Sequence, residues 1–192
     1  MLETNRIAFK EWASIVDVLG RGEQVLILRK GGIHEKGKKF SIAYEEFFLF
    51  PTFEHQNPKD LKPHTEEILG KVLAAKPDPA ILPIQYYCVV EESFWISEEK
   101  SLEALEPFHT WSRECLKGRF EWGEEKGLFG IIVRTYTFPK PVQLECLKRY
   151  GGCRSWVELE KALECATLKP VLSDSLFQEK KKEILSYCSI NA

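Results

Sequence analysis

The segment from Leu82 to Val90 restricts the fold of this 192-residue chain more than any other part of the sequence. Its apolar residues recur at every second position with Gln85 between them, and this period of two is typical of a half-buried β-strand. A second apolar segment, Leu128 to Phe138, is long enough to be another strand, and Pro139 and Pro141 follow it. The chain must therefore build a β-sheet, and the remaining segments have to pack against it.

Several other segments carry helical signals. Apolar residues recur with helical spacing over residues 6–19, and Ser155 to Glu158 has the capping-box pattern that opens a helix. The sequence predicts helices over residues 6–19, 63–75, 155–165 and 174–188, with shorter ones near residues 101–106 and 110–117. Strands over residues 24–29 and 40–50 are expected to form a hairpin. These elements favour an α+β fold with small mixed or antiparallel sheets and flanking helices.

The best linker candidate is the segment Lys76-Pro77-Asp78-Pro79. Proline lacks the backbone N–H that a helix or a central strand uses, so two prolines in four residues interrupt both kinds of element. We therefore expect an N-terminal helix–hairpin–helix α/β part over residues 1–76 and a C-terminal α+β part over residues 80–192. One continuous domain is the alternative.

Charge and hydropathy limit the partners of the chain. The formal net charge of −2 gives no overall attraction to nucleic acid or to acidic membranes, so any anion-binding surface must be local. The first residues lack a secretory signal, and no apolar stretch is long enough to span a bilayer. We therefore expect a cytoplasmic protein that does not contact membranes. The sequence leaves the oligomeric state open.

The most basic stretch of the chain follows the strand predicted over residues 24–29. Residues 21–39 contain six lysines and arginines but only two glutamates, a local excess of positive charge. Adjacent glycines let backbone N–H groups approach a phosphate closely. The predicted phosphate-binding residues are Arg29, Lys30, Gly31, Gly32, Lys36, Lys38 and Lys39. The alternative is a solvent-exposed hairpin tip, because the stretch has no G-x-x-x-x-G-K-[ST] motif.

Two further groups of residues are candidates for catalysis or metal binding. Glu54, His55 and His64 combine a carboxylate with two imidazoles, a set that could hold a divalent metal as cofactor. Glu54 and His55 are also candidate catalytic residues for proton transfer. Cys153 lies beside Arg154 near a predicted helix start, where positive charge favours a nucleophilic thiolate, so it is a third catalytic candidate.

Arginines are interleaved with aromatic residues in the second half of the chain. Indole rings and guanidinium planes stack on nucleic-acid bases, so Trp111, Arg119 and Arg134 are the predicted base-stacking residues. The alternative is core packing, because Trp111, Cys115 and Leu116 would also form the apolar stripe of an ordinary helix.

Four blocks of the sequence are similar to one known family. They are Phe9-Lys10-Glu11-Trp12, Leu28-Arg29-Lys30-Gly31-Gly32-Ile33, Phe50-Pro51-Thr52 with His55-Gln56, and Gly152-Cys153 with Ser155-Trp156-Val157. With these blocks the chain resembles, over nearly its whole length, a bacterial family called domain of unknown function 1802. The resemblance implies a prokaryotic cytosolic protein and, at most, a nucleic-acid context such as restriction–modification. It assigns no catalytic residue.

Three functional hypotheses follow from the sequence. The leading one is an accessory protein that binds the phosphates of nucleic acid or nucleotides through the basic stretch. The second is a metal-dependent phosphodiester hydrolase with Glu54, His55 and His64 at the metal. The third is an interaction protein with no small-molecule site.

Overall fold

The computed structural model describes residues 1–30, 42–54, 56–152 and 154–189. Its strands are β1 (Thr4–Trp12), β2 (Leu26–Arg29), β3 (Glu46–Thr52), β4 (Ile81–Ile96), β5 (Leu128–Glu145), β6 (Trp156–Glu164) and β7 (Lys169–Pro170). Its α-helices are α1 (Ala13–Gly20), α2 (Pro63–Ala74), α3 (Glu99–Ala104), α4 (Arg113–Glu121) and α5 (Asp174–Ser189). Short 3-10 turns are η1 (Pro58–Asp60), η2 (Glu106–Phe108) and η3 (Lys148–Tyr150).

Seven strands form one mixed sheet in the order β2-β5-β4-β3-β1-β6, and β7 pairs with β5. β1 and β3 are parallel, whereas the other neighbouring strands are antiparallel. The predicted α+β class is confirmed, although this sheet is larger than the small sheets expected. Because strands from residues 1–76 and from residues 80–192 are neighbours in it, we propose that the chain is one continuous domain.

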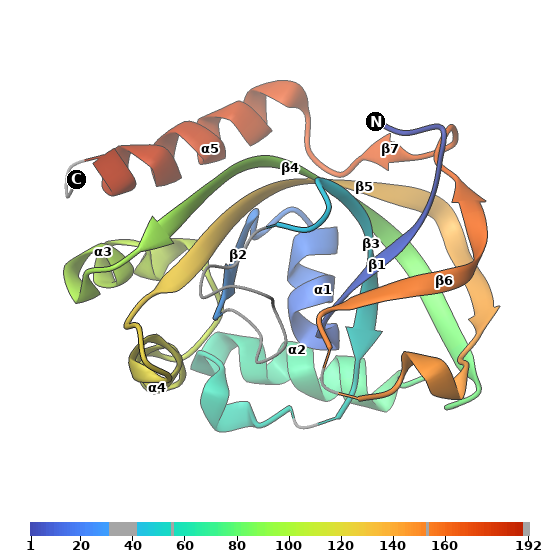
Figure 1. Ribbon diagram of the computed structural model, residues 1–192, viewed down its shortest axis with the longest axis horizontal. Coiled ribbons are helices and arrows are strands. Elements are labelled where there is room, and N and C mark those ends of the chain that lie inside the picture. Colours follow the sequence, from blue (N-terminus) through green and yellow to red (C-terminus); the bar gives the residue numbers. More distant parts are fainter. Residues whose placement is uncertain (31–41, 55, 153, 190–192) are drawn as a thin grey trace.

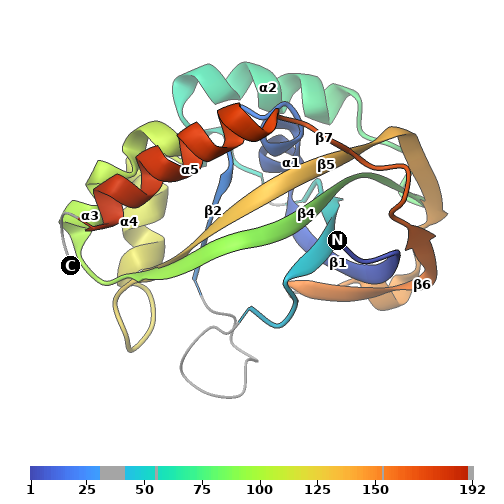
Figure 2. The same ribbon diagram turned by 90° about the horizontal axis from the view of Figure 1, so that it is seen from above.

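The sheet curves strongly, and Figure 1 shows β4 and β5 arching over α1. Arg29, at the end of β2, donates hydrogen bonds to the Lys10 carbonyl of β1 (3.1 Å) and to Ser155 Oγ just before β6 (3.3 Å). β2, the first strand in the sheet order, therefore lies close to β1 and to the start of β6, the last two strands. α1 lies between the sheet and α2, and α5 runs alongside β4 and β5 (Figures 1 and 2).

The two faces of the sheet carry separate hydrophobic cores. β3 supplies both of them, because successive side chains of a strand point to opposite faces. Phe47 and Leu49 belong to the first core, and Phe48 and Phe50 belong to the second. The unbroken apolar run of β3 thus reflects a central strand that is covered on both sides.

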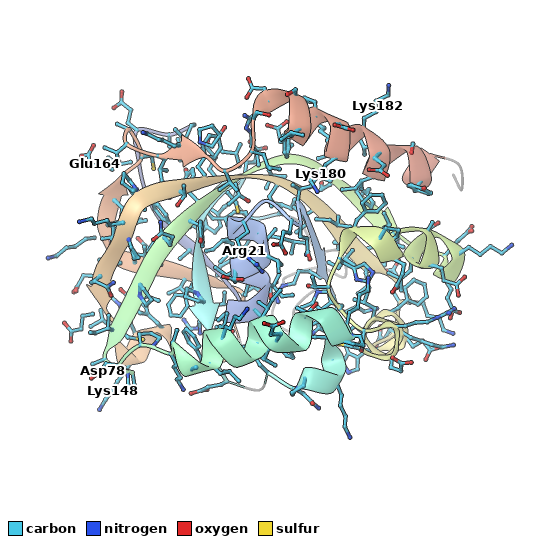
Figure 3. The ribbon with its side chains drawn as sticks, turned by 180° about the vertical axis from the view of Figure 1, so that it is seen from behind. Arg21, Asp78, Lys148, Glu164, Lys180 and Lys182 are labelled. Atoms are coloured by element: carbon cyan, nitrogen blue, oxygen red, sulfur yellow. The ribbon has the colours of Figure 1, made fainter. Side chains whose placement is uncertain are left out.

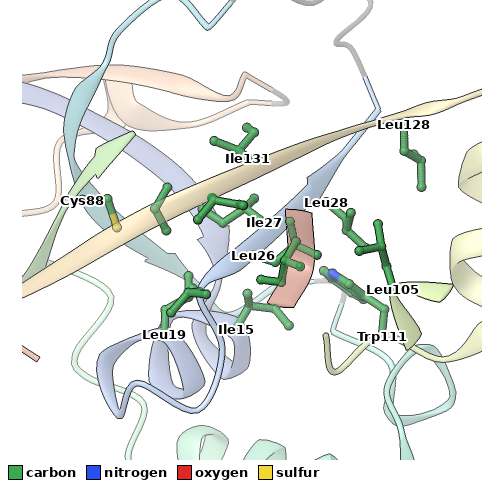
Figure 4. Packing of buried hydrophobic residues seen from close by; sticks show 14 of the residues in the cluster. Ile15, Leu19, Leu26, Ile27, Leu28, Cys88, Leu105, Trp111, Leu128 and Ile131 are labelled. Atoms are coloured by element: carbon green, nitrogen blue, oxygen red, sulfur yellow. The ribbon is translucent and has the colours of Figure 1, made fainter. Parts of the chain in front are cut away.

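In the first core, α1 packs against β2. Figure 4 shows Ile15 and Leu19 of α1 close to Leu26 and Ile27 of β2, with Trp111 nearby. All five side chains are at most 1% exposed. Removing this apolar surface from water is the main force that holds the helix on the sheet.

The helix predicted over residues 6–19 is wrong in its first half. Residues up to Trp12 form β1, and α1 covers only Ala13–Gly20. β1 lies between β3 and β6, with Ala8 buried in one core and Phe9 in the other. A strand buried on both faces lacks the period-two pattern of a half-exposed strand, so its sequence fits helical spacing equally well.

The helix predicted over residues 155–165 and the N-terminal hairpin are also wrong. Trp156–Glu164 is strand β6, in which buried Val157 and Leu159 alternate with exposed Glu158. Residues 156–164 form a strand because they pair with β1, despite the capping-box pattern at their start. Within the described ranges β2 pairs with β5, whereas β3 pairs with β1 and β4, so the two predicted hairpin strands are not partners.

The other predicted elements are confirmed with shifted ends. α2, α3, α4 and α5 correspond to the remaining predicted helices, and β2, β4 and β5 to predicted strands. β5 continues past Pro139 and Pro141 to Glu145, still paired with β4. None of the helices in the described part of the chain is long and apolar enough to cross a membrane.

Candidate nucleic-acid interface

A cleft of about 830 Å³ is lined by the ends of β1, β2 and β3, by the start of β4, and by residues between β5 and β6. β1 and β3 end side by side, because they are parallel and Trp12 pairs with Thr52. β4 begins where β5 ends, with Ile81 opposite Glu145, and β6 begins opposite Phe9 of β1. The sheet topology therefore gathers five distant segments of the chain around one hollow.

Basic side chains outnumber acidic ones two to one in this cleft. The basic residues lining it are Lys10, Arg29, Lys30, Lys76, Lys148 and Arg154, and the acidic ones are Glu11, Glu54 and Asp78. Aromatic and proline residues also line it: Trp12, Phe50, Pro51, Phe53, Pro77, Pro79, Pro83 and Tyr150. Figure 3 shows the Asp78 and Lys148 labels close together at one end of the protein. Such a hollow concentrates anions although the whole chain is slightly acidic.

Arg29 is fixed in the cleft by four contacts. Its guanidinium lies 4.6 Å from the centroid of the Phe9 ring, and Nη2 donates to the Lys10 carbonyl and to Ser155 Oγ. Nη1 lies 3.7 Å from Glu11 Oε2, an ion pair too long to be a hydrogen bond. The side chain stays 22% exposed, so its remaining N–H groups can bind a phosphate in the two-pronged manner of arginine.

Glu11 places a buried carboxylate beside Arg29. The side chain is 1% exposed, and Oε1 accepts a hydrogen bond from the Trp12 backbone N–H at 2.8 Å. The Glu11 carbonyl accepts another from Thr52 Oγ1 at 3.0 Å. Oε2 is buried and accepts no hydrogen bond from the described residues. Buried polar atoms normally have such a partner, so Glu11 keeps an unused acceptor next to the cleft.

Lys30 has a structural task within the protein. Its ammonium group donates to the carbonyls of Phe120 (3.2 Å), Glu125 (2.6 Å) and Gly127 (2.9 Å). Burial lowers the pKa of Lys30, and the nearby Glu125 carboxylate partly offsets that effect. Since an ammonium has three N–H donors, these carbonyls occupy all of them. Lys30 therefore secures the turn between α4 and β5.

Three cations of the cleft are exposed. Lys76, Lys148 and Arg154 form no ion pair with an acidic side chain among the residues that the structure describes. Lys10 differs from them, because its Nζ donates to the Gly152 carbonyl at 3.1 Å and ties β1 to the loop before β6. Together with Arg29, the three exposed cations are the groups best placed to meet an incoming anion.

The predicted phosphate-binding residues are thus only partly covered by the structure. Arg29 and Lys30 line the cleft. Gly31, Gly32, Lys36, Lys38 and Lys39 lie outside the described residues. Their role stays a prediction.

Trp111 and its neighbours form a closed region. Trp111 is 1% exposed, its ring makes an edge-type contact with that of Trp12, and the Arg119 guanidinium lies 3.8 Å from its centroid. Trp111 therefore packs in the core, the alternative raised for it, and offers no free face to a base in this arrangement. His109 is enclosed in the same region, and burial together with the nearby Lys62 ammonium lowers the pKa of His109 to about 3. We call Trp111, Arg119 and His109 the Trp111 cluster.

Arg134 lies apart from the Trp111 cluster. Its guanidinium forms an ion pair with Asp174 at the start of α5 and lies 5.2 Å from the Phe177 ring. It lines a small cavity with Leu19, Val25 and Phe177 rather than the basic cleft. These contacts fasten α5 to β5, so the structure does not bring the three predicted base-stacking residues together.

Of the catalytic and metal-binding candidates, only Glu54 has a described side chain. Glu54 is exposed and lines the cleft. His55, Cys153 and the side chain of His64 lie outside the described residues. Among the residues that are described, no three His, Cys, Asp or Glu side chains are grouped so that they could hold a metal ion. The metal site and the nucleophile stay predictions.

Sequence reasoning missed most of the cleft. Lys10, Glu11, Lys76, Lys148 and Arg154 line it, but the sequence analysis assigns none of them to a binding site. One signal was present in the sequence: Lys148 and Arg154 flank a Gly-Gly pair, as Arg29 and Lys30 precede one. Adjacent glycines in a sequence favour turns, at which basic side chains can gather.

The family model described as "Domain of unknown function (DUF1802)" matches residues 8–183. The chain belongs to this family. The matched range includes every residue that lines the cleft, from Lys10 to Ser155. A comparison with curated proteins finds no significant match.

Three matching solved structures share low sequence identity with this DUF1802 chain. The crystal structure of ASCH from Zymomonas mobilis is 10% identical, with 94% of this chain and 93% of that chain covered and a TM-score of 0.48. A point mutant of that protein gives 10% identity, coverage of 94% and 96%, and a TM-score of 0.46. Similarity at this level transfers no function to the DUF1802 chain.

Proposed function

We propose that the protein binds the phosphate backbone of a single-stranded nucleic acid in the basic cleft. The supporting observation is the convergence of Arg29, Lys76, Lys148 and Arg154 on one hollow, with three of them exposed and free of carboxylate partners in the described residues. Phosphate groups neutralise such cations and release the counterions that surround the nucleic acid, which drives binding. A restriction–modification context, implied by the family resemblance, stays a prediction.

The size and the walls of the cleft favour a single strand over a duplex. A volume of about 830 Å³ is typical of small-molecule sites and suits one or two nucleotide units. The partly exposed Trp12 and Phe53 and the prolines at residues 77 and 79 offer flat apolar surface beside the cations. Bases stack on such surfaces when the strand is unpaired, whereas a duplex keeps its bases inside.

The test compares a fluorescent single-stranded decamer with its duplex. We expect the wild-type protein to bind the single strand more tightly at low salt. The variant K76A/K148A/R154A should lose affinity by tenfold or more, because each exposed cation meets a phosphate. Its melting temperature should hardly change, since exposed charges contribute little to stability.

A matched control removes the same charge elsewhere. Lys100, Lys161 and Lys182 are exposed and do not line the cleft, and Figure 3 shows Lys182 at the opposite corner of the view from Lys148. The variant K100A/K161A/K182A should bind nearly as well as wild type. Equal losses in the two variants would show that net charge alone drives binding, and the cleft would not be the site.

A further inference from the structure

We propose that Glu11 reads the base of the bound strand, accepting a hydrogen bond from the amino group of adenine or cytosine. This inference rests on the proposed function, because it concerns the same cleft. It goes further in that it names the class of nucleotide preferred. The observation that carries it is the buried Glu11 Oε2, which accepts no hydrogen bond from the described residues.

The orientation of the Glu11 carboxylate is fixed by its neighbours. Oε1 accepts the Trp12 backbone N–H at 2.8 Å, and the main chain on either side belongs to β1, paired with β3 and β6. Oε2 must therefore be the oxygen on the side of Arg29, 3.7 Å from Nη1. A fixed acceptor of this kind is selective, because a ligand without an N–H at that point leaves it unpaired.

Arg29 links phosphate binding to access to Oε2. Oε2 is buried, so a ligand reaches it only when a neighbouring side chain moves. Arg29 is partly exposed, its hydrogen bonds to described residues all come from Nη2, and its longer contact with Glu11 is the weaker one. A phosphate in the cleft attracts the guanidinium away from Glu11. The base N–H then replaces it at the carboxylate.

The chemistry of the bases defines the prediction. Adenine and cytosine carry an exocyclic amino group on the pairing edge, where hypoxanthine and uracil carry a carbonyl oxygen. At that position a carboxylate accepts from the amino group but repels the carbonyl, and the ring N–H of hypoxanthine or uracil lies one atom further along the edge. The wild-type protein should therefore bind amino-base hexamers of adenine or cytosine roughly tenfold more tightly than the matching hypoxanthine or uracil hexamers.

The variant Glu11→Gln should reverse this preference for amino bases over keto bases. An amide nitrogen cannot accept the Trp12 N–H, so the amide oxygen takes the place of Oε1 and the NH₂ group takes the place of Oε2. The site then offers a donor, which suits a carbonyl. We expect the ratio of the keto-base Kd to the amino-base Kd to fall from about ten to below one, measured by fluorescence anisotropy.

Glu54→Gln is the matched control, because Glu54 lines the same cleft but is exposed. Loss of its charge should tighten binding of all hexamers alike and leave the ratio unchanged. Equal wild-type affinities for amino-base and keto-base hexamers, with salt-dependent binding intact, would overturn the inference on Glu11 but not the proposed function. This wild-type comparison decides the matter even if Glu11→Gln fails to fold. No binding of any hexamer at low salt would overturn both.

Discussion

The basic cleft and the Trp111 cluster both place an arginine against an aromatic ring, but they use it differently. Arg119 lies 3.8 Å from the Trp111 ring centroid and covers a side chain that is 1% exposed. Arg29 lies 4.6 Å from the Phe9 ring centroid and borders an open hollow that it shares with five other basic residues. A cation–ring contact therefore does not mark a ligand site by itself. Whether such an arginine can bind a ligand depends on whether its guanidinium borders an open cleft.

The largest expected effect is on the stability of the protein when the Trp111 cluster is disrupted. Trp111→Ala should lower the free energy of unfolding by roughly 3–5 kcal/mol, because it empties a fully packed position. Urea titration of the variant measures this loss. Single-strand affinity of the folded fraction should fall much less than in K76A/K148A/R154A, because Trp111 packs against Trp12 but does not line the cleft itself. A stable variant that no longer binds a single strand would return Trp111 to the role of a stacking platform.

The second prediction concerns the pH dependence of the same cluster. Burial and Lys62 lower the pKa of His109 to about 3, so the folded imidazole stays neutral where the unfolded one, with an ordinary pKa near 6.5, binds a proton. Stability should therefore fall as pH decreases from about 6.5 to about 3, by an amount on the order of 4 kcal/mol from this group.

Melting curves of His109→Leu isolate that contribution. The variant cannot titrate at this position, so its stability should depend less on pH between 6.5 and 3 than that of wild type. Carboxylates protonate in both proteins and cancel in the difference. Identical pH profiles would mean that His109 is not held neutral in the folded protein.

The third prediction compares the two arginines directly. Arg29→Lys keeps the charge beside Glu11 but loses the planar two-pronged donor, so single-strand affinity should fall roughly tenfold. Arg119→Lys should leave affinity unchanged, because Arg119 does not line the cleft. Anisotropy titrations of both variants in one buffer provide the measurement. The reverse order of effects would place the ligand at the Trp111 cluster.

The smallest effect is expected for Arg119→Met. A long apolar side chain can still cover Trp111, so the variant loses little more than the cation–π attraction, about 0.5–1 kcal/mol at a partly exposed site. Thermal or urea unfolding is sensitive enough to resolve that difference. A loss several times larger would show that Arg119 has structural contacts beyond the ring.

The sequence predicts elements well where one structural signal dominates. The period of two in Leu82–Val90 identifies β4, and α2 begins with Pro63 at its first position, where proline is favoured. β1 and β6 were mistaken for helices because tertiary pairing, rather than local preference, decides their structure. Ala8 and Phe9 of β1 are buried on opposite faces, a condition set by neighbours that are distant in the sequence.

The candidate site is harder to predict than the elements. Arg29 was identified from a basic stretch, but its partners Glu11 and Ser155 are 18 and 126 positions away. Lys76, Lys148 and Arg154 reach the same cleft only because β4 and β5 pair and β6 returns beside β1. Lys30 shows the converse, since a basic residue of the predicted stretch is occupied by three carbonyls.

The most direct test of the account is the salt dependence of single-strand binding. If Arg29, Lys76, Lys148 and Arg154 each contact a phosphate, log Kd plotted against log salt concentration should rise with a slope of about 3 for wild type. For K76A/K148A/R154A, with Arg29 alone remaining, the slope should be about 0.7. A slope that stays near 3 in this variant would contradict the account, because the phosphates would then be held by residues outside the cleft.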